Sequence, residues 1–191
     1  MKTNRLEAFS DGVLAIVITI MVLELKAPEG TTAQDFLHEM PVFLSYVFSF
    51  IYVGIYWNNH HHLFQATEKV NGRILWANLH LLFWLSLIPF TTSWLGENHL
   101  EAQPVALYGG NLLLCAIAYF ILQATILKFH GADFVLRKVI GKDYKGKVSA
   151  ILYILAIPLA FVNVWIAISI YVAVAIIWII PDKRIEKNMQ S

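Results

Sequence analysis

The feature that most constrains this chain is an apolar run close to its N-terminus, RLEAFSDGVLAIVITIMVLELK at residues 5–26. Residues 12–23 carry no charge, and Thr19 supplies their only hydroxyl. A bilayer core about 30 Å thick needs about 20 mostly apolar residues in a helix. The segment 9–25 nearly fills that length, so we predict a first transmembrane helix there.

Composition also indicates a membrane protein. Hydrophobic residues make up 58% of the 191 residues and charged residues 14%, against about 25% charged in soluble domains, and the mean hydropathy is +0.62. The basic residues are scattered over several loops and form no stripe for nucleic acid. The single Cys115 allows no intramolecular disulfide, so we expect it to pack as a small core hydrophobe.

The rest of the chain repeats the apolar pattern. The run 148–180 is too long for one span, so we predict two helices there, with a tight turn near residues 162–165 and the second helix ending at Pro181; one long kinked helix is the alternative. The polar stretch 29–40 predicts a loop with a short surface helix capped by Thr31 or Thr32. The other apolar runs, each read as one span, are 41–57, 74–94 and 105–127.

The sequence thus predicts an all-α, polytopic membrane protein, with residues 1–191 forming one domain of six transmembrane helices. With six spans, 13 of the 14 Lys and Arg residues lie on the side of the N-terminus, and only Lys26 lies on the other side. Cytoplasmic loops of membrane proteins carry the excess of basic residues. We therefore expect a multi-pass protein of the cell (plasma or inner) membrane with both termini cytoplasmic.

The first predicted helix has two unlike sides. At about 100° per residue, Ile16 and Leu23 lie within about 20° of each other, with Thr19 and Ile20 on either side of that line. Asp11 lies about 140° away. An ionisable group at the membrane edge needs a partner, so the side that bears Asp11 is expected to face the neighbouring helices.

Polar residues at the same predicted depth offer partners for Asp11. We expect a polar cluster that fixes the angle of the first helix; the alternative is that Ser10 or Asp11 merely caps the N-terminus of that helix. The candidate partners are Asn58, His60 and His61 at the end of the second span, and Asn78 and His80 near the start of the third.

Catalytic chemistry finds no support in the sequence. The consecutive His60, His61 and His62 point about 100° apart on a helix and cannot converge on one metal ion, so buried hydrogen bonding is favoured over metal binding. We find no Ser–His–Asp set at one depth, no phosphate-binding glycine loop and no pair of intramembrane carboxylates. Gly109 and Gly110 indicate close helix packing. We predict no enzyme, no cofactor and no resident metal.

Two short motifs stand out in the first two predicted spans. The pattern R-x-x-x-F-S-D runs directly into the first apolar helix, and W-x-x-H-H ends the second span. The third span adds an Asn and, near its end, a Pro-Phe pair. The residues are Arg5, Phe9, Ser10 and Asp11, then Trp57, His60 and His61, and then Asn78, Pro89 and Phe90. Together they resemble the motifs of a known family, the transmembrane protein 175 potassium channels of lysosomes and prokaryotes.

The resemblance implies a homotetramer in which the first helix of each copy lines a central pore. It implies that Ile16, Thr19 and Leu23 face that pore, with Ile20 as the alternative to Thr19. The expected function is a potassium-selective or potassium-preferring cation channel with a hydrophobic constriction, with K⁺ and other monovalent cations as its partners and K⁺ held transiently near Thr19. The residues assigned to the structural polar network are Arg5, Phe9, Ser10, Asp11, Trp57, Asn58, His60, His61, Asn78 and His80.

Other functions stay open at this point. A proton-conducting protein or proton-coupled cation transporter would use Asp11 and the histidine cluster as a relay. A membrane scaffold that conducts nothing is a third class. Within the channel hypothesis, the Thr19 hydroxyl either faces the ion or bonds its own helix at the Ala15 carbonyl.

Overall fold

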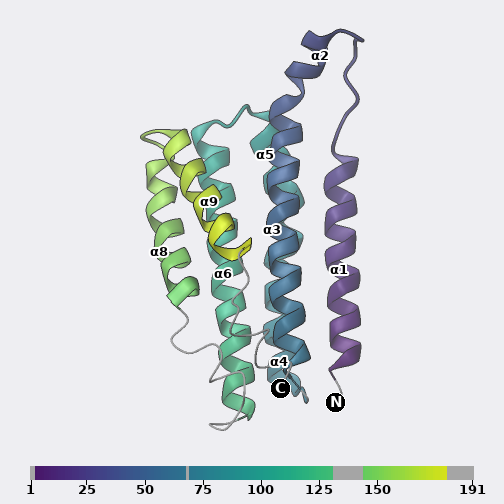
Figure 1. The fold of residues 1–191 in the computed structure, drawn as a ribbon, viewed down its shortest axis with the longest axis vertical. Helices are drawn as coiled ribbons and strands as arrows, with labels where there is room; N and C mark the ends of the chain where they lie inside the picture. The colour runs from purple at the N-terminus through teal and green to yellow at the C-terminus, as the bar shows by residue number, and fades with distance from the viewer. Residues whose placement is uncertain (1–2, 68, 131–143, 180–191) are drawn as a thin grey trace.

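The computed structural model describes residues 3–67, 69–130 and 144–179, and its regular structure is helical. The long helices run alternately up and down in a bundle, with α1 at one edge and α8 and α9 on the opposite side (Figure 1). The helices are α1 (Asn4–Leu23), α2 (Ala33–His38), α3 (Met40–Gln65), α4 (Gly72–Ser86), α5 (Ile88–Glu97), α6 (Ala102–His130), α8 (Tyr144–Leu159) and α9 (Val164–Ile179).

Helix α1 begins earlier than the sequence pattern indicated. Its N-cap is Thr3, whose backbone carbonyl accepts from the N–H groups of Leu6 and Glu7. Ser10 and Asp11 therefore lie well inside the helix, and the alternative that they cap its N-terminus is wrong. Their side chains are free to contact other elements.

The third predicted span is one apolar segment but not one regular helix. Helix α4 ends at Ser86, and α5 begins at Ile88 with Pro89 in its first turn. Pro89 has no N–H to donate to the Leu85 carbonyl, and its ring crowds that carbonyl, which explains the interruption at Leu87. The continuous segment Gly72–Glu97 is still long enough to cross a membrane.

The last apolar run contains the predicted break. Helix α8 ends at Leu159 and α9 starts at Val164, where Asn163 Oδ1 accepts from the N–H of Trp165 at 2.9 Å. One long kinked helix is thus wrong, and two helices are confirmed. The predicted end of the second helix at Pro181 lies outside the described residues, as does most of the basic loop between α6 and α8.

Four segments of the described chain are long and apolar enough to span a bilayer: Asn4–Leu23, Met40–Gln65, Gly72–Glu97 and Ala102–His130. Helices α8 and α9 have 16 residues each, or about 24 Å of helix. The protein is therefore a multi-pass membrane protein with at least these four candidate spans.

The loop between α1 and α3 contains the predicted surface helix, α2, at the far end of the bundle (Figure 1). Its cap is Thr32, one of the two predicted residues: the Thr32 hydroxyl donates to Asp35 Oδ2 at 2.6 Å and accepts from the Asp35 N–H. These bonds from Thr32, first the hydroxyl and then the backbone N–H, hold the pKa of Asp35 below its usual value.

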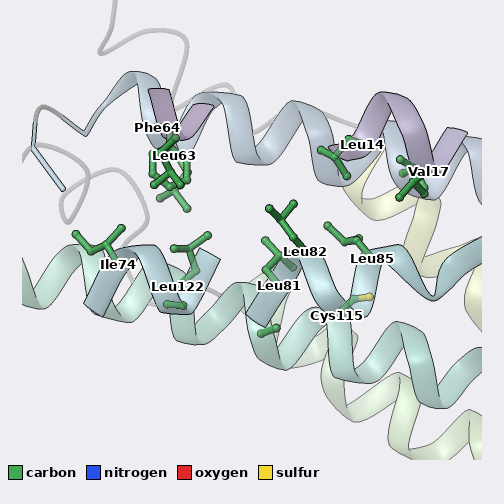
Figure 2. Close-up of a cluster of buried hydrophobic side chains, with 14 of the residues drawn as sticks. Leu14, Val17, Leu63, Phe64, Ile74, Leu81, Leu82, Leu85, Cys115 and Leu122 are labelled. Carbon is green, nitrogen blue, oxygen red and sulfur yellow. The ribbon is translucent and has the colours of Figure 1, made fainter. Parts of the chain in front are cut away.

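Two groups of buried side chains hold the bundle together. The first joins α1, α3, α4 and α6 through residues such as Leu14, Val17, Leu81 and Leu122, and it includes Cys115, which packs as the predicted core hydrophobe (Figure 2). The second joins α3, α5, α6, α8 and α9. Because the first group ties α1 to the other helices, it sets where α1 stands at the edge of the bundle.

Tyrosines are the largest buried side chains of the second group. The hydroxyl of Tyr153 donates to that of Tyr52, which in turn donates to the Tyr171 carbonyl. Tyr171 donates to the carbonyl of Val105 at 3.2 Å, so α9 is fastened to α6. A Cβ at Gly109 would collide with the Tyr171 hydroxyl, whereas one at Gly110 would meet nothing within 4 Å. The expected close packing is therefore confirmed at Gly109 and not at Gly110.

This contrast gives a matched test of the α6–α9 contact. We expect Gly109→Ala to destabilise the purified protein by about 1–3 kcal/mol, because the added methyl must displace Tyr171. Gly110→Ala, one residue along the same helix, should be neutral or slightly stabilising, since alanine favours a helix. Thermal unfolding in detergent measures both, and equal unfolding temperatures for the two variants would contradict this packing.

Candidate functional site

Helix α1 is packed on one side only. Its buried residues are Leu6, Ser10, Leu14, Val17 and Met21, and it contacts α3, α4 and α5. The opposite side is not covered by any described part of the chain. We call that side the open face of α1 and define it by Phe9, Ile16, Thr19, Ile20 and Leu23, all exposed in the single chain.

The open face carries one aromatic side chain, Phe9, and one hydroxyl, that of Thr19, and is otherwise aliphatic. Ile16 is 58% exposed and Leu23 is 80% exposed. The four positions that the resemblance assigned to a pore, Ile16, Thr19, Ile20 and Leu23, all lie on this face. A set of large aliphatic side chains in one line on an uncovered helix face is suited to contact lipid, another chain or a narrow passage.

The hydroxyl of Thr19 is bonded to its own helix. Thr19 Oγ1 donates to the carbonyl of Ile16 at 2.8 Å. The acceptor is thus three residues back and is not Ala15, which the sequence had suggested as the alternative partner. Because a hydroxyl oxygen keeps acceptor lone pairs after donating its proton, Thr19 can still offer oxygen to a cation.

A buried hydrogen-bond chain ties the packed side of α1 to α3 and α4. Asn78 Nδ2 donates to Ser10 Oγ at 2.9 Å, and His60 Nε2 bonds Asn78 Oδ1 at 2.8 Å. Ser10 Oγ donates in turn to the carbonyl of Leu6 at 2.8 Å. Ser10, His60 and Asn78 are fully buried. Inside a membrane no water is available to bond these polar groups. The hydrogen-bond chain therefore favours one rotation of α1 about its own axis.

Two further pairs lie beside this chain. Trp57 Nε1 donates to Asp11 Oδ1 at 3.0 Å, and His61 Nδ1 lies 3.0 Å from Glu7 Oε1. The rings of Trp57 and His61 stack, with centroids 5.9 Å apart. Asp11 is therefore bonded by Trp57, not by Asn58, His60 or Asn78. Sequence reasoning missed Glu7, although Glu7 and Asp11, and likewise Trp57 and His61, are four residues apart and so face the same way on their helices.

The structure does not join the whole predicted network. Arg5 and Phe9 are exposed, Phe9 on the open face, and no side-chain bond of Asn58 is found in the described chain. His80 is exposed and accepts from Trp84 on its own helix at 3.0 Å. The polar contacts thus centre on Ser10, Asn78 and His60, with Asp11–Trp57 and Glu7–His61 beside them. Among the described residues, no group of three or more His, Cys, Asp or Glu side chains is placed to hold a metal ion.

The comparison with protein families matches residues 5–89 to the model described as "Endosomal/lysosomal potassium channel TMEM175". This range holds α1, α3 and α4, and with them both the open face and the Ser10–Asn78–His60 chain.

Whole-chain comparisons extend the likeness. The chain is 57% identical to "Potassium channel HX13_20290" of Chryseobacterium sp. (strain P1-3), over 100% of both chains. It also resembles the crystal structure of "a lysosomal potassium-selective channel TMEM175 homolog" from Chamaesiphon minutus, with a TM-score of 0.81, 28% identity, and 94% and 97% of the two chains covered. The "Endosomal/lysosomal proton channel TMEM175" of Mus musculus is 29% identical over 48% of this chain and 19% of its own length.

The buried chain can be tested by removing its central residue. Asn78→Leu keeps a similar volume but leaves Ser10 and His60 without their partner, so we expect a loss of about 1–3 kcal/mol per unsatisfied group. Asn58→Leu is the control, because it removes an amide from the same region. Thermal unfolding of the purified protein measures both; an Asn78→Leu protein as stable as Asn58→Leu would show that the buried chain does not hold α1.

Proposed function

The chain belongs to the family of the endosomal/lysosomal potassium channel TMEM175, and from this premise we propose that it is a potassium channel whose pore is lined by the open face of α1. The family is one of ion channels, so the prediction of no enzyme is confirmed. The observation that carries the proposal for the pore is the exposed aliphatic line of Ile16 and Leu23 on the uncovered side of α1.

One chain cannot enclose a path for ions. It contributes a single α1, at the edge of its bundle (Figure 1). Copies related by a rotation axis can bring their open faces together, and most soluble homo-oligomers have closed rotational symmetry of this kind. We therefore propose a homotetramer in which four copies of α1 surround the axis and the other helices lie outside them.

In such a tetramer the four Ile16 side chains would form one ring around the axis and the four Leu23 side chains another. These two stacked rings would select between ions. Apolar rings resist wetting, so an ion passes only after it sheds part of its water. K⁺ holds its water less tightly than Na⁺ and is favoured at such a constriction. Four Thr19 oxygens would stand between the Ile16 and Leu23 rings and could take the place of some of the lost water; Ile20, on the other flank, is the alternative at this height. No cofactor is needed, and K⁺ is the permeant ion.

The buried chain of Ser10, Asn78 and His60 would serve this pore by orienting it. If α1 rotated about its own axis by one residue, about 100°, the residue next to Ile16 in the sequence would face the tetramer axis in its place. The hydrogen bonds to α3 and α4 oppose that rotation from the packed side of α1. The network is thus proposed to position the pore rather than to contact the ion.

Six spans and cytoplasmic termini complete the proposal. The supporting observation is the distribution of basic residues, 13 of 14 on the side of the N-terminus. Helices α8 and α9, short as they are, would cross the bilayer as the fifth and sixth spans. The membrane proposed is the plasma or inner membrane of the cell.

Proton conduction is the second candidate, because the Mus musculus relative carries the name of a proton channel. The groups that could relay protons are Asp11 and Glu7, with His61 bonded to Glu7. A potassium channel passes K⁺ down its gradient without a coupled change of internal pH. A proton pathway acidifies the vesicle interior when the outside is acid, with or without K⁺.

The pore assignment predicts the effect of wetting the rings. Ile16→Asn or Leu23→Asn should raise cation flux and bring K⁺ and Na⁺ flux closer together, because the dewetted gap is the barrier to a hydrated ion. Thr19→Ala should keep flux and lower the preference for K⁺. The measurement is K⁺, Na⁺ and proton flux into proteoliposomes at equal protein content.

Two controls accompany these variants. Ile154 on α8 is 56% exposed, close to the value for Ile16, but α8 lies on the far side of the bundle (Figure 1); Ile154→Asn should leave selectivity unchanged. Val17 is buried against the neighbouring helices, so Val17→Asn should reduce folding. Unchanged flux and selectivity in all of the Ile16, Thr19 and Leu23 variants, with intact folding, would remove α1 from the pore.

A further inference from the structure

A cavity of about 250 Å³ lies between α3, α6 and α8, with Trp178 of α9 in its wall. Its inner residues Tyr52, Ser149 and Tyr153 are buried, whereas Ile117 and Phe120 of α6 and Lys147 of α8 are exposed. The cavity thus opens to the surroundings between α6 and α8. It belongs to no part of the proposed pore.

The position of the opening decides what surrounds it. Helices α6 and α8 lie away from α1 in the bundle (Figure 1). If the open faces of α1 meet at a central axis, an opening beside α8 points outward, to the lipid. Lys147 lies in the first turn of α8, and Lys128 lies in the last turn of α6. The start of α8 points toward the end of the bundle at which α6 ends (Figure 1). Anionic headgroups are attracted to basic residues at the cytoplasmic membrane surface.

The wall of the cavity favours hydrocarbon over water. Trp178 Nε1 donates to Ser149 Oγ at 2.8 Å, and Ser149 donates to the Lys145 carbonyl. Asn59 Nδ2 donates to the Ile55 carbonyl at 2.8 Å, so one polar atom of this amide is also bonded within the protein. The surface that the wall exposes to the cavity is mostly apolar and includes Ile55, Ala116 and Phe120. An apolar space beside a bilayer gains dispersion contacts when an acyl chain enters it.

We propose that this cavity is a binding site for an anionic phospholipid of the inner leaflet, with an acyl chain between α3, α6 and α8 and the phosphate beside Lys147. The volume is below the roughly 300–1,000 Å³ of sites for whole drug-sized ligands, and it suits part of one acyl chain. The headgroup stays outside, where the Lys147 ammonium reaches it.

The test compares two lipids that share their acyl chains. The purified full-length protein is titrated with dioleoyl phosphatidylglycerol or dioleoyl phosphatidylcholine, and bound lipid is counted by native mass spectrometry. We expect the dissociation constant for phosphatidylglycerol to be about fivefold lower than that for phosphatidylcholine, because the attraction of one lysine to an anionic headgroup corresponds to about that factor. Lys147→Gln should abolish this preference, whereas Lys128→Gln, outside the cavity, should keep it.

A second variant tests the acyl chain. Ala116 lines the cavity and Ala124, two turns further along α6, does not. Ala116→Phe should reduce the binding of both lipids, and Ala124→Phe should not. Equal binding of the two lipids by the unmodified protein, a preference that survives Lys147→Gln, or displacement of the phospholipid by oleate at equal concentration would overturn the proposal. None of these results depends on whether the pore conducts.

Discussion

The structure depends on one buried contact, the hydrogen-bond chain from Ser10 on α1 through Asn78 on α4 to His60 on α3. Inside a bilayer, apolar side chains give a helix little reason to prefer one rotation over another, because lipid is as apolar as its neighbours. Buried polar groups do give a reason, since each loses its partner when the helix turns. The Ser10–Asn78–His60 hydrogen-bond chain therefore determines which side of α1 is packed and which is open.

The two sides of α1 differ in what they contact. Leucines and Val17 on the packed side join the core drawn in Figure 2, while Ile16, Ile20 and Leu23 remain uncovered. In the proposed tetramer the uncovered side would line the pore, so the residues that stabilise the fold and those proposed to meet the ion would be different residues of one helix. Under this proposal, substitutions on the open face could change the pore without loss of the bundle.

Much of this arrangement could be predicted from the sequence, for physical reasons that differ from residue to residue. Apolar length located the four segments that are long and apolar enough to span a bilayer, and the helical period placed Ile16, Thr19 and Leu23 on one side and Asp11 on another. The pattern could not show that Trp57 is the partner of Asp11, because this pairing depends on how α1 and α3 pack against each other. The interruption at Leu87 is a local effect of Pro89, and the proline in the sequence could have indicated it. Glu7 was not among the predicted residues, because partners were expected for Asp11 alone, and Phe9 was misplaced because a shared motif does not imply a shared face.

The central claim is that the open face of α1 lines the ion pathway, and thiol modification tests it most directly. Ile16→Cys and Leu23→Cys are exposed to a positively charged methanethiosulfonate reagent during K⁺ flux, with buried Cys115 as the unreactive background and Ile154→Cys as the lipid-facing control. The account predicts that modification at Leu23→Cys and Ile16→Cys blocks K⁺ flux and that modification at Ile154→Cys does not. Complete modification of Leu23→Cys and Ile16→Cys, verified by mass, with unchanged K⁺ flux would contradict it.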